Sequence, residues 1–236
     1  EITPVITNSK ERIDLLEEML DNDKEKMRKA LEEFYAISVR EASMIQMLEQ
    51  LNLPISIQTV VDPTLLLKKE DYIQGLKLEK MVTAEKYIFV YILGGTKAYG
   101  NIVNEAKKIA KQNGLQIKYV FDNNNAMIKN MGFDCSGCNP REFVSMIYNA
   151  EYVLTNSFHA TVFSIIFKKN FTSCARGKSS GRITELLSSL GLEERFNLES
   201  NGCIIAINSY DKVHQLLANM KIESMIYLEN ALKVEG

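Results

Sequence analysis

The hydrophobic positions of the second half of the chain alternate between short apolar runs and amphipathic segments of helical period. Residues 87–93 form a continuous apolar run typical of a central parallel strand, and further strands are predicted at residues 116–121, 152–154 and 171–174. Residues 203–207 are a candidate fifth strand. Helical patterns cover residues 99–113, 140–150, 157–167, 180–190 and 209–233. This alternation predicts β–α–β units, and hence an α/β fold: a doubly wound, Rossmann-like parallel sheet with helices on both faces.

The first third of the chain has a different pattern. Fifteen charged side chains fall within residues 9–34, where Asp21-Asn22-Asp23 is a candidate break between two helices. An apolar stripe at spacings of three, four and seven predicts the helical face there: Ile13, Leu16, Leu20, Met27, Leu31 and Phe34. Shorter elements follow, with strands at 36–39 and 55–61 and helices at 40–51 and 69–76. Residues 1–77 therefore belong partly to another structural unit, and we expect the stripe to pack against a neighbouring domain.

Composition and charge exclude several classes of protein. The 236 residues carry 28 Lys and Arg against 30 Asp and Glu, a net charge of −2, so a nucleic-acid partner is not expected. No apolar run approaches the roughly 20 residues that cross a bilayer. Four cysteines are too few for a disulfide scaffold, and no signal peptide is recognised. A soluble, cytoplasmic protein is expected. Because the chain opens at Glu1 rather than Met, three alternatives are open: a fragment, a processed product, or a chain that lacks its beginning.

The sharpest candidate for chemistry is the junction at residues 154–161, where a predicted strand ends and a helix begins. Ser157 is a plausible N-cap, and the N–H groups of Phe158 and His159 fall in the first turn of the helix. A helix start favours an anion, and a histidine there can add a hydrogen bond or a proton. The alternative is a capped helix with an incidental histidine.

Other strand ends are weaker candidates. The loop at residues 175–182 places Arg176, Lys178 and Arg182 at a helix start, which suits a phosphate or carboxylate, although a solvated basic loop explains it equally well. Gly94-Gly95-Thr96 has neither a dinucleotide-binding nor a P-loop spacing, and a tight turn accounts for it. Arg40 follows the strand predicted at 36–39, where a ligand contact or a salt bridge at the helix start would fit.

The remaining motifs point to no metal or cofactor. Cys135 and Cys138 have CxxC spacing, but neither a second CxxC nor an HxxxH pair completes a zinc site. Redox chemistry at this pair is conceivable because Pro140 predicts a helix start close by. His214 falls on the charged face of the last predicted helix and is expected to be a surface residue.

Taken together, several segments resemble the polysaccharide pyruvyl transferase family over roughly residues 35–196. The run ending in Asn-Ser-Phe-His is the most specific of them. The segments are AISVRE (36–41), VDPTLLL (61–67), PREF (140–143), NAEYVLTNSFHATVFSIIF (149–167), RI (182–183), LL (186–187) and LGLEER (190–195).

The resemblance implies a GT-B-like fold with the active site between two Rossmann-like halves. It implies three regions: residues 1–77 as the tail of an incomplete N-terminal half, 78–207 as the C-terminal domain, and 208–236 as a helix packing back toward the N-terminal part. The family transfers a pyruvyl group from phosphoenolpyruvate to two hydroxyls of a saccharide, which forms a ketal and releases phosphate during synthesis of bacterial cell-surface polysaccharides. The saccharide acceptor can be lipid-linked or polymeric, and no membrane span or metal is required.

The resemblance also implies roles for individual residues. The family's motif residues fall on Arg40, expected to grip the donor's anionic groups, and on His159, expected to bind the donor and shuttle protons. Contacts to the substrate are expected from Asn156, Ser157, Phe158, Arg176, Lys178 and Arg182. Two alternatives remain open: a GT-B glycosyltransferase that uses a nucleotide sugar, and a non-catalytic binding domain derived from the family.

Overall fold

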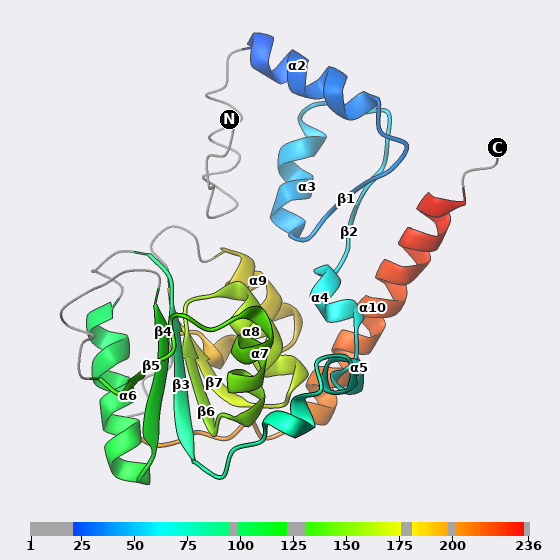
Figure 1. Cartoon of the computed structure of the whole chain (residues 1–236). Helices are drawn as coiled ribbons and strands as arrows, with labels where there is room; N and C mark the ends of the chain where they lie inside the picture. The colour runs from blue at the N-terminus through cyan, green and yellow to red at the C-terminus, as the bar shows by residue number, and fades with distance from the viewer. Residues whose placement is uncertain (1–20, 95–98, 122–130, 176–180, 198–201, 234–236) are drawn as a thin grey trace. The chain divides into compact units, whose positions relative to one another are not determined.

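The computed structural model describes residues 21–94, 99–121, 131–175, 181–197 and 202–233 (Figure 1). The chain divides into two compact units. Unit 1 comprises Glu1–Leu66 and Asp211–Gly236, and unit 2 comprises Leu67–Tyr210. Each unit has its own sheet and its own packed side chains.

Unit 2 is built on a parallel sheet with five strands among the described residues, in the order β5-β4-β3-β6-β7. The strands are β3 (Tyr87–Ile92), β4 (Gln116–Phe121), β5 (Phe133–Asp134), β6 (Tyr152–Thr155) and β7 (Asn170–Ser173). β3 and β6 are almost wholly buried, as the continuous apolar runs predict for strands that are covered on both faces.

Helices cover both faces of this sheet, with α6 on one side and α7 and α8 on the other (Figure 1). The described residues of unit 2 form the helices α5 (Lys69–Gly75), α6 (Tyr99–Asn113), α7 (Pro140–Asn149), α8 (Phe158–Ile166) and α9 (Gly181–Ser189), with short 3-10 turns η1 (Leu78–Met81) and η3 (Glu193–Arg195). Ile88, Val90 and Ile92 share a core cluster with α6, whereas Phe89 and Tyr91 on the other face contact the Phe143 ring of α7. The predicted doubly wound α/β sheet is confirmed.

One predicted strand is wrong. Residues 203–207 form no strand. The carbonyl groups of Ile205 and Ala206 instead accept hydrogen bonds from the buried Arg195 guanidinium, at 2.7 and 2.8 Å. The fifth strand is β5, which the sequence pattern misses because it has only two residues, and the side chain of Phe133 is 57% exposed.

Unit 1 holds a smaller parallel sheet of β1 (Ile37–Val39) and β2 (Ile57–Thr59). Its helices among the described residues are α2 (Asp21–Glu32), α3 (Ala42–Glu49), α4 (Pro63–Leu66) and most of α10 (Tyr210–Leu232). Met27 and Leu31 of the predicted apolar stripe pack on a core cluster formed by β1 and α3. Within the described residues, no helix is long and apolar enough to cross a bilayer.

The last helix belongs to unit 1. The Val61 N–H, just after β2, donates to the Oγ of Ser224 on α10 at 2.9 Å, and both groups are buried. The division between the units falls at Leu66, whereas the sequence places a boundary at residue 77. The difference arises because α5 packs into unit 2, where the Tyr72 ring lies edge-on to the Phe163 and Phe167 rings at 5.2 and 6.3 Å.

Candidate functional site

The candidate site lies at the carboxyl edge of the unit 2 sheet, where β6 leads into α8. Ser157 has the extended backbone of an N-cap, and its Oγ accepts a long hydrogen bond from the Ala160 N–H at 3.5 Å. Thr155, the last residue of β6, donates its hydroxyl to the Tyr91 carbonyl at 2.6 Å and accepts the Ser157 N–H at 3.0 Å. Two hydroxyl side chains therefore fix the turn that opens α8, at the strand end where doubly wound sheets bind ligands.

Asn156 joins this turn to the end of β3. Its Oδ1 accepts the Leu93 N–H at 2.7 Å, and its Nδ2 donates to the Leu93 carbonyl at 2.8 Å. Only 3% of Asn156 is exposed, and both ends of its amide are engaged with one backbone residue. The sequence predicts a substrate contact for Asn156, whereas its geometry is that of a clamp holding two strand ends in register.

The end of β7 is tied to the same turn. The Cys174 N–H donates to the Thr155 carbonyl at 2.7 Å, and the hydroxyls of Thr161 and Ser173 share a hydrogen bond of 2.7 Å. Thr161 also donates to the Ser157 carbonyl at 2.9 Å. Because these groups are buried, the carboxyl ends of β3, β6 and β7 form one rigid platform beneath the start of α8.

Three predicted residues lie close together at the start of α8. The guanidinium carbon of Arg182, in the first turn of α9, is 5.8 Å from the centroid of the Phe158 ring. The Phe158 and His159 rings are 5.5 Å apart and nearly perpendicular. His159 is exposed, and Phe158 and Arg182 are half-buried. A cation and an imidazole thus flank one aromatic ring at a helix N-terminus, an arrangement that suits an anionic ligand.

Two of the predicted cations, Arg176 and Lys178, lie outside the described residues. The described chain on one side of them is anchored, because the Ala175 N–H donates to the Asn197 Oδ1 at 2.9 Å. On the other side, α9 begins at Gly181, immediately before Arg182.

Arg40 belongs to unit 1, where it forms an ion pair with Asp62. Arg40 follows β1 and Asp62 follows β2, so the pair sits at the carboxyl edge of the small parallel sheet. Burial acts to raise the pKa of Asp62, but hydrogen bonds from Thr64 and Arg40 outweigh it and hold that pKa below its ordinary value. Asp62 is therefore an ionised partner that orients the Arg40 guanidinium while 40% of the Arg40 side chain stays exposed.

Comparison with known proteins now identifies the family. A family model described as polysaccharide pyruvyl transferase matches residues 19–178, which is well over half of the chain and includes the β6–α8 turn. The chain belongs to the polysaccharide pyruvyl transferase family. The predicted family resemblance is confirmed. Among curated proteins, no match is found.

Similar solved structures include two nucleotide-sugar epimerases and a polymerase. The UDP-GlcNAc 2-epimerase of Methanocaldococcus jannaschii shares 15% identity over 79% of this chain and 54% of its own, with a TM-score of 0.48. The UDP-N-acetylglucosamine 2-epimerase of Rickettsia bellii shares 13% identity over 88% and 65%, with a TM-score of 0.45. The wall teichoic acid polymerase TagF shares 8% over 91% and 57%, with a TM-score of 0.39. This pyruvyl transferase family member thus spans 54–65% of the length of these proteins.

Sequence reasoning about this pyruvyl transferase family member missed Asp62 as the partner of Arg40. A partial signal was available, because Arg40 and Asp62 each come directly after a predicted strand, but the pairing of the two strands is known only from the structure. It also missed that Thr155 and Asn156 are engaged with β3, which requires knowing that β3 and β6 are adjacent in the sheet. Among the described residues, no group of three or more His, Cys, Asp or Glu side chains is arranged to hold a metal ion.

Proposed function

We propose that this chain supplies the donor site of a pyruvyl transferase, which moves a pyruvyl group from phosphoenolpyruvate to two hydroxyls of a saccharide as a cyclic ketal. The observation that supports this most is the gathering of His159, Phe158 and Arg182 at the N-terminus of α8. Membership of the family supports a transferase that acts on polysaccharides.

The donor carries a phosphate and a carboxylate, and the site offers matching groups for both. A guanidinium binds either group through two parallel hydrogen bonds, and a helix N-terminus attracts negative charge through its backbone N–H groups and its dipole. The half-buried Arg182 and the start of α8 are therefore the proposed anion contacts in unit 2. Ser157 has its hydroxyl in the cap, and its proposed contribution is to hold the helix start in place.

The chemistry needs a group that gives and takes protons near neutral pH. Protonation of the donor's methylene carbon places positive charge on the neighbouring carbon, and one saccharide hydroxyl attacks that carbon and loses its proton. The second hydroxyl then displaces phosphate and closes the ketal. Imidazole is the ordinary side chain that titrates nearest neutrality, so we assign these proton transfers to His159.

The other predicted anion contacts stay predictions. Arg40 is expected to bind the donor's anionic groups, with Asp62 setting the orientation of its guanidinium. Arg176 and Lys178 are expected to add positive charge close to Arg182 in the sequence. The cleft between two Rossmann-like halves, the cytoplasmic location and the acceptor saccharide are likewise proposals that rest on the family.

The first test exploits the presence of only two histidines, His159 and His214. Titration with phosphoenolpyruvate is expected to shift the imidazole C–H signals of His159 in a saturable way and to leave those of His214 unchanged. Arg182→Ala is expected to weaken this binding about 10- to 100-fold, because a charge-assisted hydrogen bond contributes about 1.5–3 kcal/mol. The measurement is a proton–carbon NMR titration, with Lys107→Ala on the exposed side of α6 as the charge-matched control.

Two comparators separate the proposal from its alternatives. Inorganic phosphate is expected to shift the His159 signals more weakly, since it lacks the carboxylate. A stronger response to uridine diphosphate would instead favour a glycosyltransferase. The titrations are made with this chain and with the full-length gene product, each checked to be folded. If none of the three ligands shifts the His159 signals in either protein, the donor site is not at the start of α8.

A further inference from the structure

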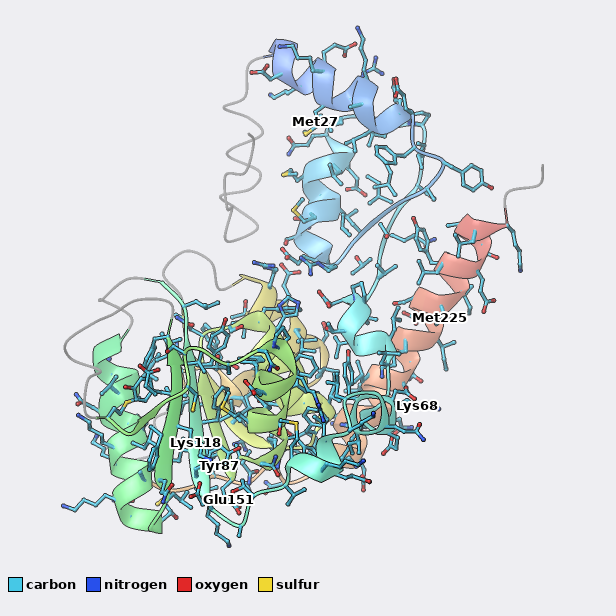
Figure 2. The ribbon with its side chains drawn as sticks, viewed as in Figure 1. Met27, Lys68, Tyr87, Lys118, Glu151 and Met225 are labelled. Carbon is cyan, nitrogen blue, oxygen red and sulfur yellow. The ribbon has the colours of Figure 1, made fainter. Side chains whose placement is uncertain are left out.

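A second group of reactive side chains in unit 2 is the pair Cys135 and Cys138, between β5 and α7. Both line a cavity of about 430 Å³ whose other walls include Tyr87, Lys118, Asp134 and Glu142. Tyr87 opens β3 and lies beside Lys118, with the Nζ atom 4.3 Å from the centre of the ring (Figure 2). The cavity is therefore bounded by the amino end of β3, whereas His159 follows the carboxyl end of β6.

The two cysteines occupy the first and last positions of one tight turn. The Cys138 N–H donates to the Cys135 carbonyl at 3.0 Å, across Ser136 and Gly137. In a β-turn these two positions have Cα atoms within about 7 Å, which overlaps the range of about 4.4–6.8 Å found in disulfides. The hydrogen-bonded turn thus places the backbone of the two cysteines at a separation compatible with a disulfide, and the Cys135 thiol is near enough to contribute to raising the pKa of Cys138.

The turn is held in place from both sides. The Cys135 N–H donates to the Tyr119 carbonyl of β4 at 2.8 Å. The Ser136 N–H donates to the Asp134 Oδ1 at 2.9 Å, and the Ser136 hydroxyl accepts the Phe121 N–H at 3.2 Å. Gly137 at the tip has open space around the position of a Cβ atom, so a small molecule can approach the turn there.

Metal binding does not account for the pair, because no third suitable ligand joins the two thiols among the described residues. Burial raises the pKa of both thiols, and Lys118 only partly offsets this for Cys135. Both groups are thus mainly protonated at neutral pH, and a first attack on an external disulfide is slow. Once one cysteine has formed a mixed disulfide, the attack of the other cysteine on it is intramolecular and is favoured by the closeness of the two residues.

We propose that Cys135 and Cys138 form a dithiol–disulfide modification site for small disulfides of the glutathione class. One cysteine, as its thiolate, attacks the external disulfide, forms a mixed disulfide and releases one small thiol. The second cysteine then attacks the protein sulfur of that mixed disulfide, closes the Cys135–Cys138 bond and releases the second small thiol. The protein loses two electrons and two protons, and the external disulfide gains both. This site is independent of the proposed transferase function.

The test is incubation of the full chain with oxidised glutathione, followed by alkylation and peptide mass mapping. The tryptic peptide of residues 130–141 contains Cys135 and Cys138 but neither Cys174 nor Cys203, so its mass reports the pair alone. In the wild type, this peptide is expected to become two hydrogens lighter and to escape alkylation. In Cys138→Ser, the second step is impossible, and the peptide is expected to keep a glutathione adduct. Cys203→Ser is the matched control and is expected to behave as the wild type.

A second measurement needs no variant. One equivalent of a trivalent arylarsenical, a reagent that bridges two neighbouring thiols, is expected to protect Cys135 and Cys138 together from alkylation in the wild type. Stable glutathione adducts in the wild type, or full alkylation of both cysteines after either treatment, would overturn the proposal.

Discussion

Replacement of His159 with alanine is expected to lower pyruvyl transfer by about 100- to 10,000-fold, the range in which a positioned general acid or base contributes. The loss arises because alanine removes the ionisable side chain of the first turn of α8, to which the proton transfers are assigned. His159 is exposed, so the same replacement is expected to change the free energy of unfolding by less than about 0.5 kcal/mol.

The measurement is incorporation of labelled pyruvyl groups from phosphoenolpyruvate into a panel of saccharide acceptors by the full-length gene product. His214→Ala removes the other histidine, which lies on α10 in unit 1, and is the matched control. Circular dichroism and the unfolding midpoint show whether each variant is folded. Full transfer activity in folded His159→Ala would remove the role assigned to this residue.

Replacement of Asn156 with aspartate is expected to destabilise the chain by about 3 kcal/mol at neutral pH, because it breaks the clamp on Leu93. The Asn156→Asp carboxylate can still accept the hydrogen bond from the Leu93 N–H. It can no longer donate to the Leu93 carbonyl, so a carboxylate oxygen takes the place of Nδ2, which lies 2.8 Å from that carbonyl oxygen. Burial and this carbonyl favour the protonated acid, so the pKa of the new carboxyl is expected to be higher in the folded than in the unfolded chain.

That difference gives the loss of stability a definite pH dependence. The protonated Asn156→Asp acid can donate to the Leu93 carbonyl, so the destabilisation is expected to shrink as the pH falls toward about 5 and to grow again toward neutrality. Urea unfolding of both proteins at the two pH values measures it. Asn104→Asp, exposed on α6, is the control for adding a carboxylate to unit 2. An equal loss of unfolding free energy at both pH values would show that the hydrogen bond from Nδ2 to the Leu93 carbonyl does not stabilise the chain.

The Asn156 clamp also bears on activity. It holds the backbone of Leu93 against the turn that presents Phe158 and His159, so it acts on the proposed chemistry only through the position of those residues. The same logic applies to Asp62, whose ionised carboxylate orients Arg40 in unit 1. In both cases a buried polar residue fixes the position of a functional residue that was predicted from the sequence.

Much of the fold could be predicted because local patterns determine it. The helix at Tyr99–Asn113 and the strand at Gln116–Phe121 have the predicted bounds, since Gly114 ends the helix and the apolar run that follows suits a buried strand. β5 was missed because it is only two residues long and exposed. Residues 203–207 were wrongly predicted as a strand because they have the apolar character of one, but the Ile205 carbonyl accepts a hydrogen bond from the Arg195 guanidinium instead.

The sequence by itself determined the α/β class, most of the strands and helices, the family, and the place of His159 at a helix start. These depend on hydrophobic period, on capping residues and on a continuous motif, all of which are local along the chain. Only the tertiary structure decided that Asn156 binds Leu93, that Arg182 lies over Phe158 and that Asp62 pairs with Arg40. Such contacts join residues that are distant in sequence, and they form only because strand order and packing bring those residues to one edge of a sheet.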